Sequence, residues 1–457
     1  MSYVSTNPAT GETLEVFESA TDTEIADSLG RADAAYQAWR GVEITERATV
    51  VSRVAKLYRE RADELAVAVS LEMGKPVSEA LYEVSVVADI YDYYASEGPA
   101  FAADETLTVR SGGEAIVRHE PLGVLLGIMP WNFPYYQVAR FVAPNLILGN
   151  TIVLKHAENC PRIARIIEDI FRDAGLPDGT YVNVFASKEQ VATMIADRRV
   201  QGVSLTGSER AGTAVAEVAA RNLKKCVLEL GGSDPFIVLD GESLDATVDA
   251  AVTARIFNAG QTCTAAKRFI VMADCYQGFV DRFTEKMAAI EPGDPLDPAT
   301  VMGPLSSEAA ARGLLAQIHD AVEKGATLRA GGHRVDGPGA FVEATVLTEV
   351  TPDMRAFSEE LFGPAAVIYK VDGVEEAISL ANNSPYGLGS AIFSADEDLA
   401  KSVAARLEYG MVSINSGTIS EPDLPFGGVK RSGFGRELGR AGMEEFVNKK
   451  LVRTPAH

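Results

Sequence analysis

The chain has 457 residues, of which 47% are hydrophobic and 23% charged, which is typical of a folded protein with about three domain-sized units. Its net charge of −22 argues against nucleic acid as a partner, because nucleic-acid binding requires a basic surface. No apolar run approaches the ~18 residues of a membrane helix, so we expect no membrane partner.

The N-terminus and the cysteine and histidine contents exclude further classes. The N-terminus lacks the basic and apolar regions of a signal peptide, and four cysteines without a CxxC pair suit a reducing compartment. We therefore expect a cytoplasmic protein. The five histidines form neither an HExxH motif nor a Cys/His cluster, so we expect no metal.

The first 105 or so residues are predicted to be helical and poor in strands. Thr21 and Glu24 have the spacing of a capping box that opens a helix ending near Trp39. Apolar residues recur at helical spacing over residues 46–72 and 77–96. Beyond them, residues 114–121 alternate in polarity, which predicts an exposed strand or hairpin used for assembly.

From Gly123 the chain alternates between short apolar strands and helices. Strands are predicted at residues 123–128, 151–155, 181–185 and 201–205. This alternation predicts a parallel sheet covered by helices on both faces, an architecture that suits nucleotides.

No GxGxxG fingerprint accompanies this sheet. Residues 206–212 instead form a small-residue turn that opens a helix, whose N-terminal N–H groups can bind a phosphate. On local grounds, an ordinary turn with Ser208 near the N-cap fits this segment about equally well.

Two residues attract attention as chemical groups. Cys263 lies in a small loop, residues 260–264, between a predicted helix (244–257) and a buried strand (268–272). A thiol there can contact a ligand and lie near backbone N–H dipoles that favour the thiolate, although most single cysteines are inert.

Glu229 ends an apolar strand, where burial would raise its pKa toward that of a general base. The alternative is a glutamate at a strand end that faces solvent.

Six short segments share their sequence and order with one known family. They read PWNFP, LTGS, ELGG, GQTC, ELFGP and PFGG, at residues 130–134, 205–208, 229–232, 260–263, 360–364 and 425–428. In these segments, which spread over most of its length, the chain resembles the aldehyde dehydrogenase superfamily.

The resemblance implies an α/β fold with a Rossmann-like cofactor domain, an α/β catalytic domain and a small β oligomerisation arm. The NAD(P)-binding domain would comprise residues 1–108 and 123–232, and the catalytic domain residues 233–430. Residues 109–122 and 431–457 would form the arm and tail of a homodimer or homotetramer.

The resemblance also implies a mechanism for three residues. The Cys263 thiolate would attack an aldehyde, and Asn132 together with the Cys263 backbone N–H would stabilise the oxyanion. After hydride transfer to the cofactor, Glu229 would activate water to hydrolyse the thioester. A glutamate at this position separates the chain from acylating relatives, which commonly lack it.

The cofactor-binding residues carried over from the family favour NAD over NADP. The Glu158 carboxylate can accept hydrogen bonds from ribose hydroxyls but would repel a 2′-phosphate. The residues implied for the adenosine ribose, the pyrophosphate with its adjoining cleft, and the nicotinamide ribose and ring are, in that order, Lys155 and Glu158; Gly207, Ser208 and Trp131; Glu360 and Phe362.

For the substrate, the chain resembles the shorter bacterial succinate semialdehyde dehydrogenases. Arg140 and Ser420 match the residues that bind the substrate carboxylate in that branch. Two positions depart from some members: Phe257 replaces an arginine, and Ala265 replaces a second cysteine that serves as a redox switch. The alternatives are a dehydrogenase of another small aliphatic or acidic aldehyde and, more remotely, a cysteine hydrolase or an inactive paralogue.

Overall fold

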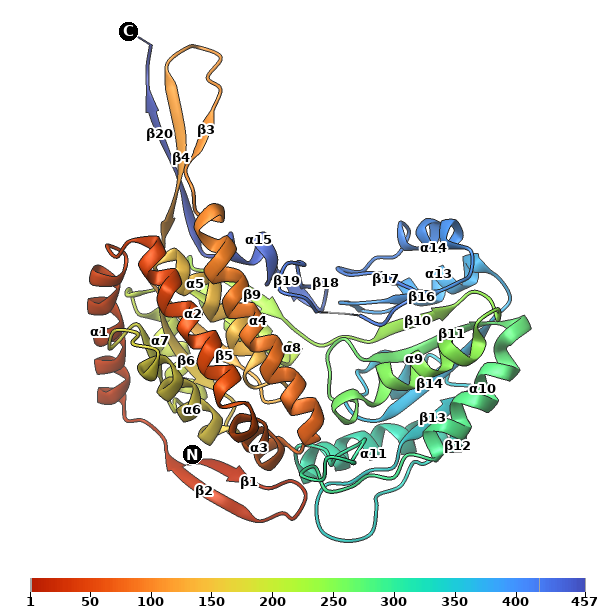
Figure 1. Cartoon of the computed structure of the whole chain (residues 1–457). Coiled ribbons are helices and arrows are strands. Elements are labelled where there is room, and N and C mark those ends of the chain that lie inside the picture. The colour runs from red at the N-terminus through yellow and green to blue at the C-terminus, as the bar shows by residue number, and fades with distance from the viewer. Residues whose placement is uncertain (1, 419, 457) are drawn as a thin grey trace.

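The computed structural model describes residues 2–418 and 420–456, which form two α/β units joined side by side, with a β arm projecting from one of them (Figure 1). The first unit contains the orange and yellow helices of Figure 1, and the second contains most of the green and blue elements. Within the described residues, no helix is long and apolar enough to cross a membrane.

The first unit is organised around a six-stranded sheet with the order β19-β9-β8-β5-β6-β7. Its strands are parallel except β19, which pairs antiparallel with β9 at the edge. The central strands are buried apolar runs because helices cover both faces. The strands are β5 (Val124–Met129), β6 (Thr151–His156), β7 (Tyr181–Asn183), β8 (Val200–Thr206), β9 (Lys225–Glu229) and β19 (Gly433–Phe434).

Helices of the first unit pack against this sheet and against one another. The predicted capping box is confirmed, since the Thr21 side chain accepts from Glu24 N and the Glu24 carboxylate accepts from Thr21 N. The helices are α1 (Asp22–Trp39), α2 (Ile44–Glu60), α3 (Ala62–Met73), α4 (Val77–Phe101), α5 (Tyr136–Leu148), α6 (Pro161–Asp173), α7 (Lys188–Ala196), α8 (Glu209–Arg221) and the short α15 (Gly439–Met443).

The second unit contains a seven-stranded sheet with the order β12-β13-β14-β11-β10-β16-β17, parallel except for the edge strand β12. Its strands are β10 (Asp234–Val238), β11 (Ala266–Met272), β12 (Thr327–Ala330), β13 (Thr345–Thr348), β14 (Ala365–Val371), β16 (Ala391–Phe393) and β17 (Ser413–Ile414). A small ladder pairs β15 (Tyr386–Gly387) with β18 (Val429–Lys430). The helical elements are α9 (Leu244–Ile256), the 3₁₀ turn η1 (Phe257–Gly260), α10 (Ala273–Ala288), α11 (Glu308–Glu323), α12 (Arg355–Ser358), α13 (Val374–Asn382) and α14 (Glu397–Ala404).

The predicted exposed strand at residues 114–121 is confirmed as β4 (Glu114–Pro121), the centre of the projecting arm (Figure 1). It pairs antiparallel with β3 (Glu105–Leu107) on one side and with β20 (Val447–Thr454) on the other. The arm therefore joins a strand from the first quarter of the chain to its last strand.

Two segments differ from the sequence-based expectation. Strands β1 (Ser2–Thr6) and β2 (Thr13–Glu18) form a hairpin where few strands were expected, and Tyr3 anchors it by donating to Ala186 O at 2.7 Å. Residues 431–446 were assigned to the tail, but they supply β19 to the first sheet and α15 beside α4, where Tyr94 donates to Gly439 O at 2.8 Å. Both segments are held by partners far away in the sequence.

Candidate active site

The predicted site residues of the first unit follow the carboxyl ends of its parallel strands. Trp131 and Asn132 follow β5, Glu158 follows β6, Ser208 follows β8, and Glu229 ends β9. Between β5 and β8 the strand order changes direction, and ligands of doubly wound sheets bind at such switch points. The carboxyl ends of these strands lie next to the loop that carries Cys263, since Asn132 donates to Gln261 O.

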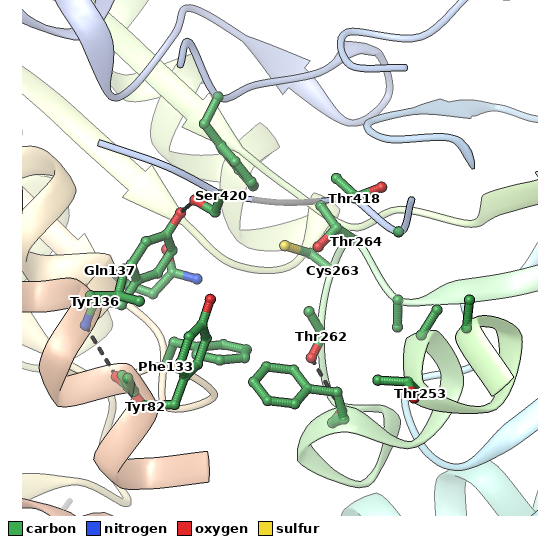
Figure 2. A pocket seen from close by; sticks show the side chains of 18 residues that line it. Tyr82, Phe133, Tyr136, Gln137, Thr253, Thr262, Cys263, Thr264, Thr418 and Ser420 are labelled. Carbon is green, nitrogen blue, oxygen red and sulfur yellow. Dashed lines mark hydrogen bonds between the residues drawn. The ribbon is translucent and has the colours of Figure 1, made fainter. Parts of the chain in front are cut away.

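A cavity of about 480 Å³ opens at Cys263 (Figure 2). Its lining is mainly aromatic and aliphatic, with hydroxyl groups near the thiol. No lysine, arginine or histidine is among the described residues that line it. The cavity therefore suits a small organic molecule with a largely apolar body. The aromatic lining residues are Tyr82, Phe133, Tyr136, Phe257 and Phe426.

Cys263 is half-buried, and its sulfur points into this cavity (Figure 2). Burial raises the pKa of the thiol to about 12, while the positive charges of Arg140 and Lys267 act in the opposite direction. The sequence suggested that backbone dipoles would favour the thiolate. Burial is the largest influence on the pKa of this thiol, and it acts against the thiolate.

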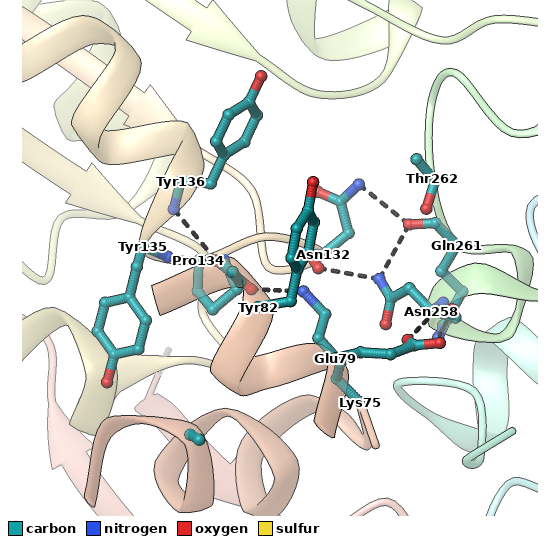
Figure 3. A network of polar contacts seen from close by, with 12 residues as sticks. Lys75, Glu79, Tyr82, Asn132, Pro134, Tyr135, Tyr136, Asn258, Gln261 and Thr262 are labelled. Atoms are coloured by element: carbon teal, nitrogen blue, oxygen red, sulfur yellow. Dashed lines mark hydrogen bonds and ion pairs between the residues drawn. The ribbon is translucent and has the colours of Figure 1, made fainter. Parts of the chain in front are cut away.

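Asn132 lies against the loop that precedes the thiol. Its side chain is buried, and Nδ2 donates to Gln261 O at 3.1 Å, two residues before Cys263 (Figure 3). The amide nitrogen carries a second N–H group that can donate to a developing oxyanion. The structure thus brings the predicted oxyanion donor to the predicted nucleophile loop.

Glu229 is 2% exposed, and neither carboxylate oxygen has a hydrogen-bond partner among the described residues. Burial raises the pKa of this carboxyl well above its ordinary value, and the nearby Glu437 raises it further, while Arg140 lowers it. Arg140 also lowers the pKa of Cys263, so its charge acts on both groups. An unpaired buried carboxyl with a raised pKa has the properties of a general base.

Arg140 does not line the cavity, because its guanidinium is buried and held by other groups. Nε lies 2.8 Å from a Glu437 oxygen, one terminal nitrogen donates to Gln137, and the other lies 3.4 Å from the Tyr136 hydroxyl. The guanidinium carbon is also sandwiched between the rings of Tyr136 and Phe426, at 4.7 and 4.2 Å from their centroids. An arginine with these partners is not free to bind a substrate carboxylate directly.

Ser420, in contrast, does line the cavity, and its hydroxyl is hydrogen-bonded to that of Tyr136 (Figure 2). The Tyr136 hydroxyl therefore bridges Arg140 and Ser420, the two residues expected to bind a substrate carboxylate. Tyr136 and Ser420 therefore line the same cavity as the Cys263 thiol, and the buried Arg140 guanidinium lies next to the Tyr136 hydroxyl.

The residues expected to hold a dinucleotide fall into two groups. Near the adenosine end, the Lys155 ammonium lies 3.4 Å from the half-exposed Glu158 carboxylate. At the start of α8, Ser208 is the N-cap and accepts from Ala211 N at 3.4 Å, which is the ordinary role considered for it. A Cβ built on Gly207 would meet only one heavy atom within 4 Å, so the space before the helix N-terminus is open to a phosphate.

The nicotinamide-side residues lie close to the cysteine loop. Trp131 and Phe362 make an edge-to-face contact with centroids 5.7 Å apart. The Glu360 carboxylate accepts from Gly232 N at 3.1 Å and lies 3.3 Å from the buried Lys267 ammonium. Acceptors for ribose hydroxyls, an open helix N-terminus and an aromatic pair together fit a nicotinamide dinucleotide.

Comparison with known proteins agrees with this geometry. The profile of the aldehyde dehydrogenase family matches residues 1–452. The chain belongs to the aldehyde dehydrogenase family. It is 58% identical over 451 residues to a succinate-semialdehyde dehydrogenase [NADP(+)] of Deinococcus radiodurans, a match covering 99% of this chain and 94% of the relative.

Solved structures of aldehyde dehydrogenases have the same fold. The succinic semialdehyde dehydrogenase of Streptococcus pyogenes, in complex with NADP+, superposes with a TM-score of 0.98 at 45% identity, over 99% of this chain and 100% of that one. The betaine aldehyde dehydrogenase of Staphylococcus aureus, in complex with NAD+, gives a TM-score of 0.96 at 30% identity, over 99% and 91%. Family members named for different aldehydes therefore share this fold.

Sequence reasoning missed three residues of this aldehyde dehydrogenase site. Tyr136 follows the PWNFP segment and looked like part of a helix, yet its hydroxyl lies between Arg140 and Ser420. Lys267 donates to Thr262 O and Cys263 O at 3.0 and 2.7 Å, and Glu437 pairs with Arg140. Only the rarity of charged residues at buried positions could have singled out the last two, and burial is not visible in one sequence.

Proposed function

We propose that this aldehyde dehydrogenase oxidises succinate semialdehyde to succinate with NAD(P)+. The observation that carries the proposal is the pair of hydroxyls, Tyr136 and Ser420, that faces the Cys263 cavity with Arg140 directly behind it. The names of the relatives from Deinococcus radiodurans and Streptococcus pyogenes support the same substrate.

The chemistry starts at Cys263, whose thiol passes its proton to solvent water; the resulting thiolate attacks the aldehyde carbon and forms a thiohemiacetal anion. Asn132 Nδ2 and the Cys263 backbone N–H stabilise the oxyanion, and such donors are each worth on the order of 100- to 1000-fold in rate. The residues described above would hold the cofactor, whose nicotinamide ring would accept the hydride. Glu229 then takes a proton from water, which attacks the thioester and releases the acid.

The carboxylate end of the substrate is proposed to meet hydroxyls and not the guanidinium itself. Each hydroxyl carries one O–H donor, so both can donate to a substrate carboxylate in the cavity once it replaces their mutual hydrogen bond. Arg140 supplies a buried positive charge that favours an anion there, while Glu437 partly offsets it. In this proposal Tyr136 and Ser420 contact the substrate carboxylate, and Arg140 acts on that carboxylate through its charge.

Kinetics with two substrates of similar size test this proposal. Tyr136→Phe and Ser420→Ala each remove one donor, and loss of a hydrogen bond to a charged group costs about 1.5–3 kcal/mol, or roughly 10- to 150-fold. We expect kcat/KM for succinate semialdehyde to fall by that factor while kcat/KM for butanal changes little. Equal losses for both aldehydes would contradict the carboxylate assignment.

A second candidate function is oxidation of an uncharged aliphatic aldehyde. The apolar lining of the cavity and the lack of a cationic side chain among its described lining residues favour this candidate. An unmodified enzyme that prefers butanal over succinate semialdehyde would establish it.

We also infer that NAD+ is preferred over NADP+. The name of the relative from Deinococcus radiodurans includes NADP(+), and the enzyme from Streptococcus pyogenes is in complex with NADP+. The inference rests on Glu158, whose carboxylate lies beside Lys155 where the adenosine ribose is expected and offsets its positive charge. Repulsion between unit charges at about 4 Å amounts to about 1 kcal/mol in water and more in a partly buried site.

The test compares kcat/KM for the two cofactors. Glu158→Ala should raise the ratio of the NADP+ value to the NAD+ value at least about fivefold. Glu217→Ala, which removes an exposed carboxylate near the far end of α8, serves as the control and should leave the ratio unchanged. A ratio that already favours NADP+ in the unmodified enzyme would overturn the inference.

Finally, we propose a cytoplasmic homodimer or homotetramer that assembles through the projecting arm. The arm leaves the body of the subunit as a sheet of only three strands, with exposed leucine and valine side chains. Such isolated ribbons are stabilised by packing against another surface.

A further inference from the structure

The turn that leads into Cys263 is strained. Asn258, Ala259 and Gly260 follow one another with φ values of +55°, +51° and +73°. Asparagine and glycine tolerate the left-handed region, but alanine does so at a cost because of its Cβ. Strain of this kind persists only where surrounding contacts hold the backbone in place.

Two of the contacts that hold this turn come from the other unit of the molecule. Asn258 N donates to the Glu79 carboxylate at 2.7 Å, and Glu79 belongs to α4. The Asn258 side chain donates to Asn132 O at 2.9 Å and to Gln261 O at 3.2 Å (Figure 3). One residue in the strained turn therefore touches the helical layer, the oxyanion residue and the nucleophile loop.

The same helix also fixes the segment that carries Asn132. Glu83, one turn after Glu79, accepts from Tyr135 N at 2.9 Å and from Tyr136 N at 3.1 Å. Its charge is balanced by the buried Lys75, whose ammonium lies 3.6 Å from the centroid of the Phe133 ring. Residues at i and i+4 share one face of a helix, so α4 presents two carboxylates to two different loops.

We propose that Glu79 is a positioning residue that holds the Cys263 loop in register with Asn132 through Asn258. This inference rests on the proposed role of Cys263 as the nucleophile. Glu79 touches neither the substrate nor the thiol; it fixes the backbone of the turn so that the thiol and the amide face the same carbonyl. Glu83 fixes the Asn132 side of the same arrangement.

The alignment can be measured without the natural substrate or the cofactor. In p-nitrophenyl acetate, the Cys263 thiolate attacks the carbonyl carbon and expels p-nitrophenolate, leaving an acetyl thioester on the protein. This step forms an oxyanion next to Asn132, and its rate is read from the burst of yellow p-nitrophenolate. Cys263→Ala should abolish the burst and so identifies the signal.

Four variants separate positioning from simple loss of stability. Glu79→Ala removes the acceptor, whereas Glu79→Gln keeps a carbonyl oxygen that can accept from Asn258 N. Asn258→Gly permits the left-handed backbone but removes both side-chain donors. Val87→Ala, at a fully buried position of the same helix about two turns after Glu79, is the control for stability.

We expect Glu79→Ala and Asn258→Gly to lower both the burst rate and kcat for the aldehyde by about tenfold or more, since small misplacements of reacting groups are costly. The KM for the cofactor should stay unchanged, and Glu79→Gln should recover most of the rate. Val87→Ala should lower the Tm but leave the burst rate intact.

An unchanged burst rate in both Glu79→Ala and Asn258→Gly overturns the inference, and so does an equal loss of rate in Val87→Ala. An unmodified enzyme with no Cys263-dependent burst also overturns it, because the loop would then carry no nucleophile. A normal burst combined with no oxidation of any aldehyde would contradict the proposed function alone, and the effect of Glu79 on the burst would still decide this inference.

Discussion

At the scale of single residues, the site depends on charges that the fold keeps away from water. Glu229, Glu437 and Arg140 are each at most 4% exposed, and the charge of Arg140 lowers the pKa of both carboxyls. Burial penalises the ionised forms of the carboxylates, so the pKa of each is raised. Glu437 takes the direct ion pair with Arg140, and this leaves Glu229 as the carboxyl without a partner. Glu437 is therefore held in an ion pair, whereas Glu229 is free to act as the proposed base.

Replacing Glu229 tests its role as the base. Glu229→Gln cannot accept the proton of the attacking water, so we expect steady-state turnover to fall by about 100- to 10,000-fold. Acylation of Cys263 does not need this base, so a single stoichiometric burst of reduced cofactor should remain. Rapid-mixing absorbance at 340 nm separates the two phases, and an undiminished steady-state rate would contradict the assignment.

The pH dependence of turnover follows from the same raised pKa. Only the ionised carboxylate can take a proton, and burial shifts its formation to higher pH than for an ordinary glutamate. Steady-state turnover should therefore rise with pH until Glu229 is ionised. This rise should be absent from the residual activity of Glu229→Gln.

At the scale of elements, the sequence predicted those parts whose signals are local. The apolar run of β5, the capping box of α1 and the helix–loop–strand pattern around Cys263 are each encoded within a few residues, and all three are present. The hairpin of β1 and β2 and the edge strand β19 were missed. Both depend on partners far along the chain, since β19 pairs with β9 about 200 residues earlier.

The same limit applies to the candidate site. Motifs carried over from the family could name Cys263, Glu229 and Asn132, because each motif is contiguous in the sequence. They could not indicate that Arg140 forms an ion pair with Glu437, a residue that follows it by almost 300 positions. Nor could they indicate that burial of the cysteine loop raises the pKa of its thiol. Side-chain pairing and hydration are set by tertiary structure, which local patterns do not contain.

At the scale of the whole molecule, the arm projects from the body of the chain (Figure 1). All three of its strands carry mainly exposed or half-exposed side chains, and Leu451 and Val452 on β20 are 60% and 41% exposed. Apolar side chains on a projecting sheet with open edges favour contact with another protein surface. The net charge of −22 opposes association of identical subunits at long range, and physiological salt screens that repulsion.

A charge placed on the arm tests whether this surface joins subunits. Leu451→Lys should lower the oligomer mass measured by light scattering after size exclusion, because burying an unpaired ammonium at an interface is costly. Leu223→Lys adds the same charge at a leucine that is 96% exposed beyond the end of α8, and the mass should stay unchanged. Both variants should be compared at about 0.15 M salt, where the Debye length is about 8 Å and general repulsion is screened equally. If Leu451→Lys keeps the mass of the unmodified protein, subunits meet through another surface and the exposed face of β20 has no role in assembly.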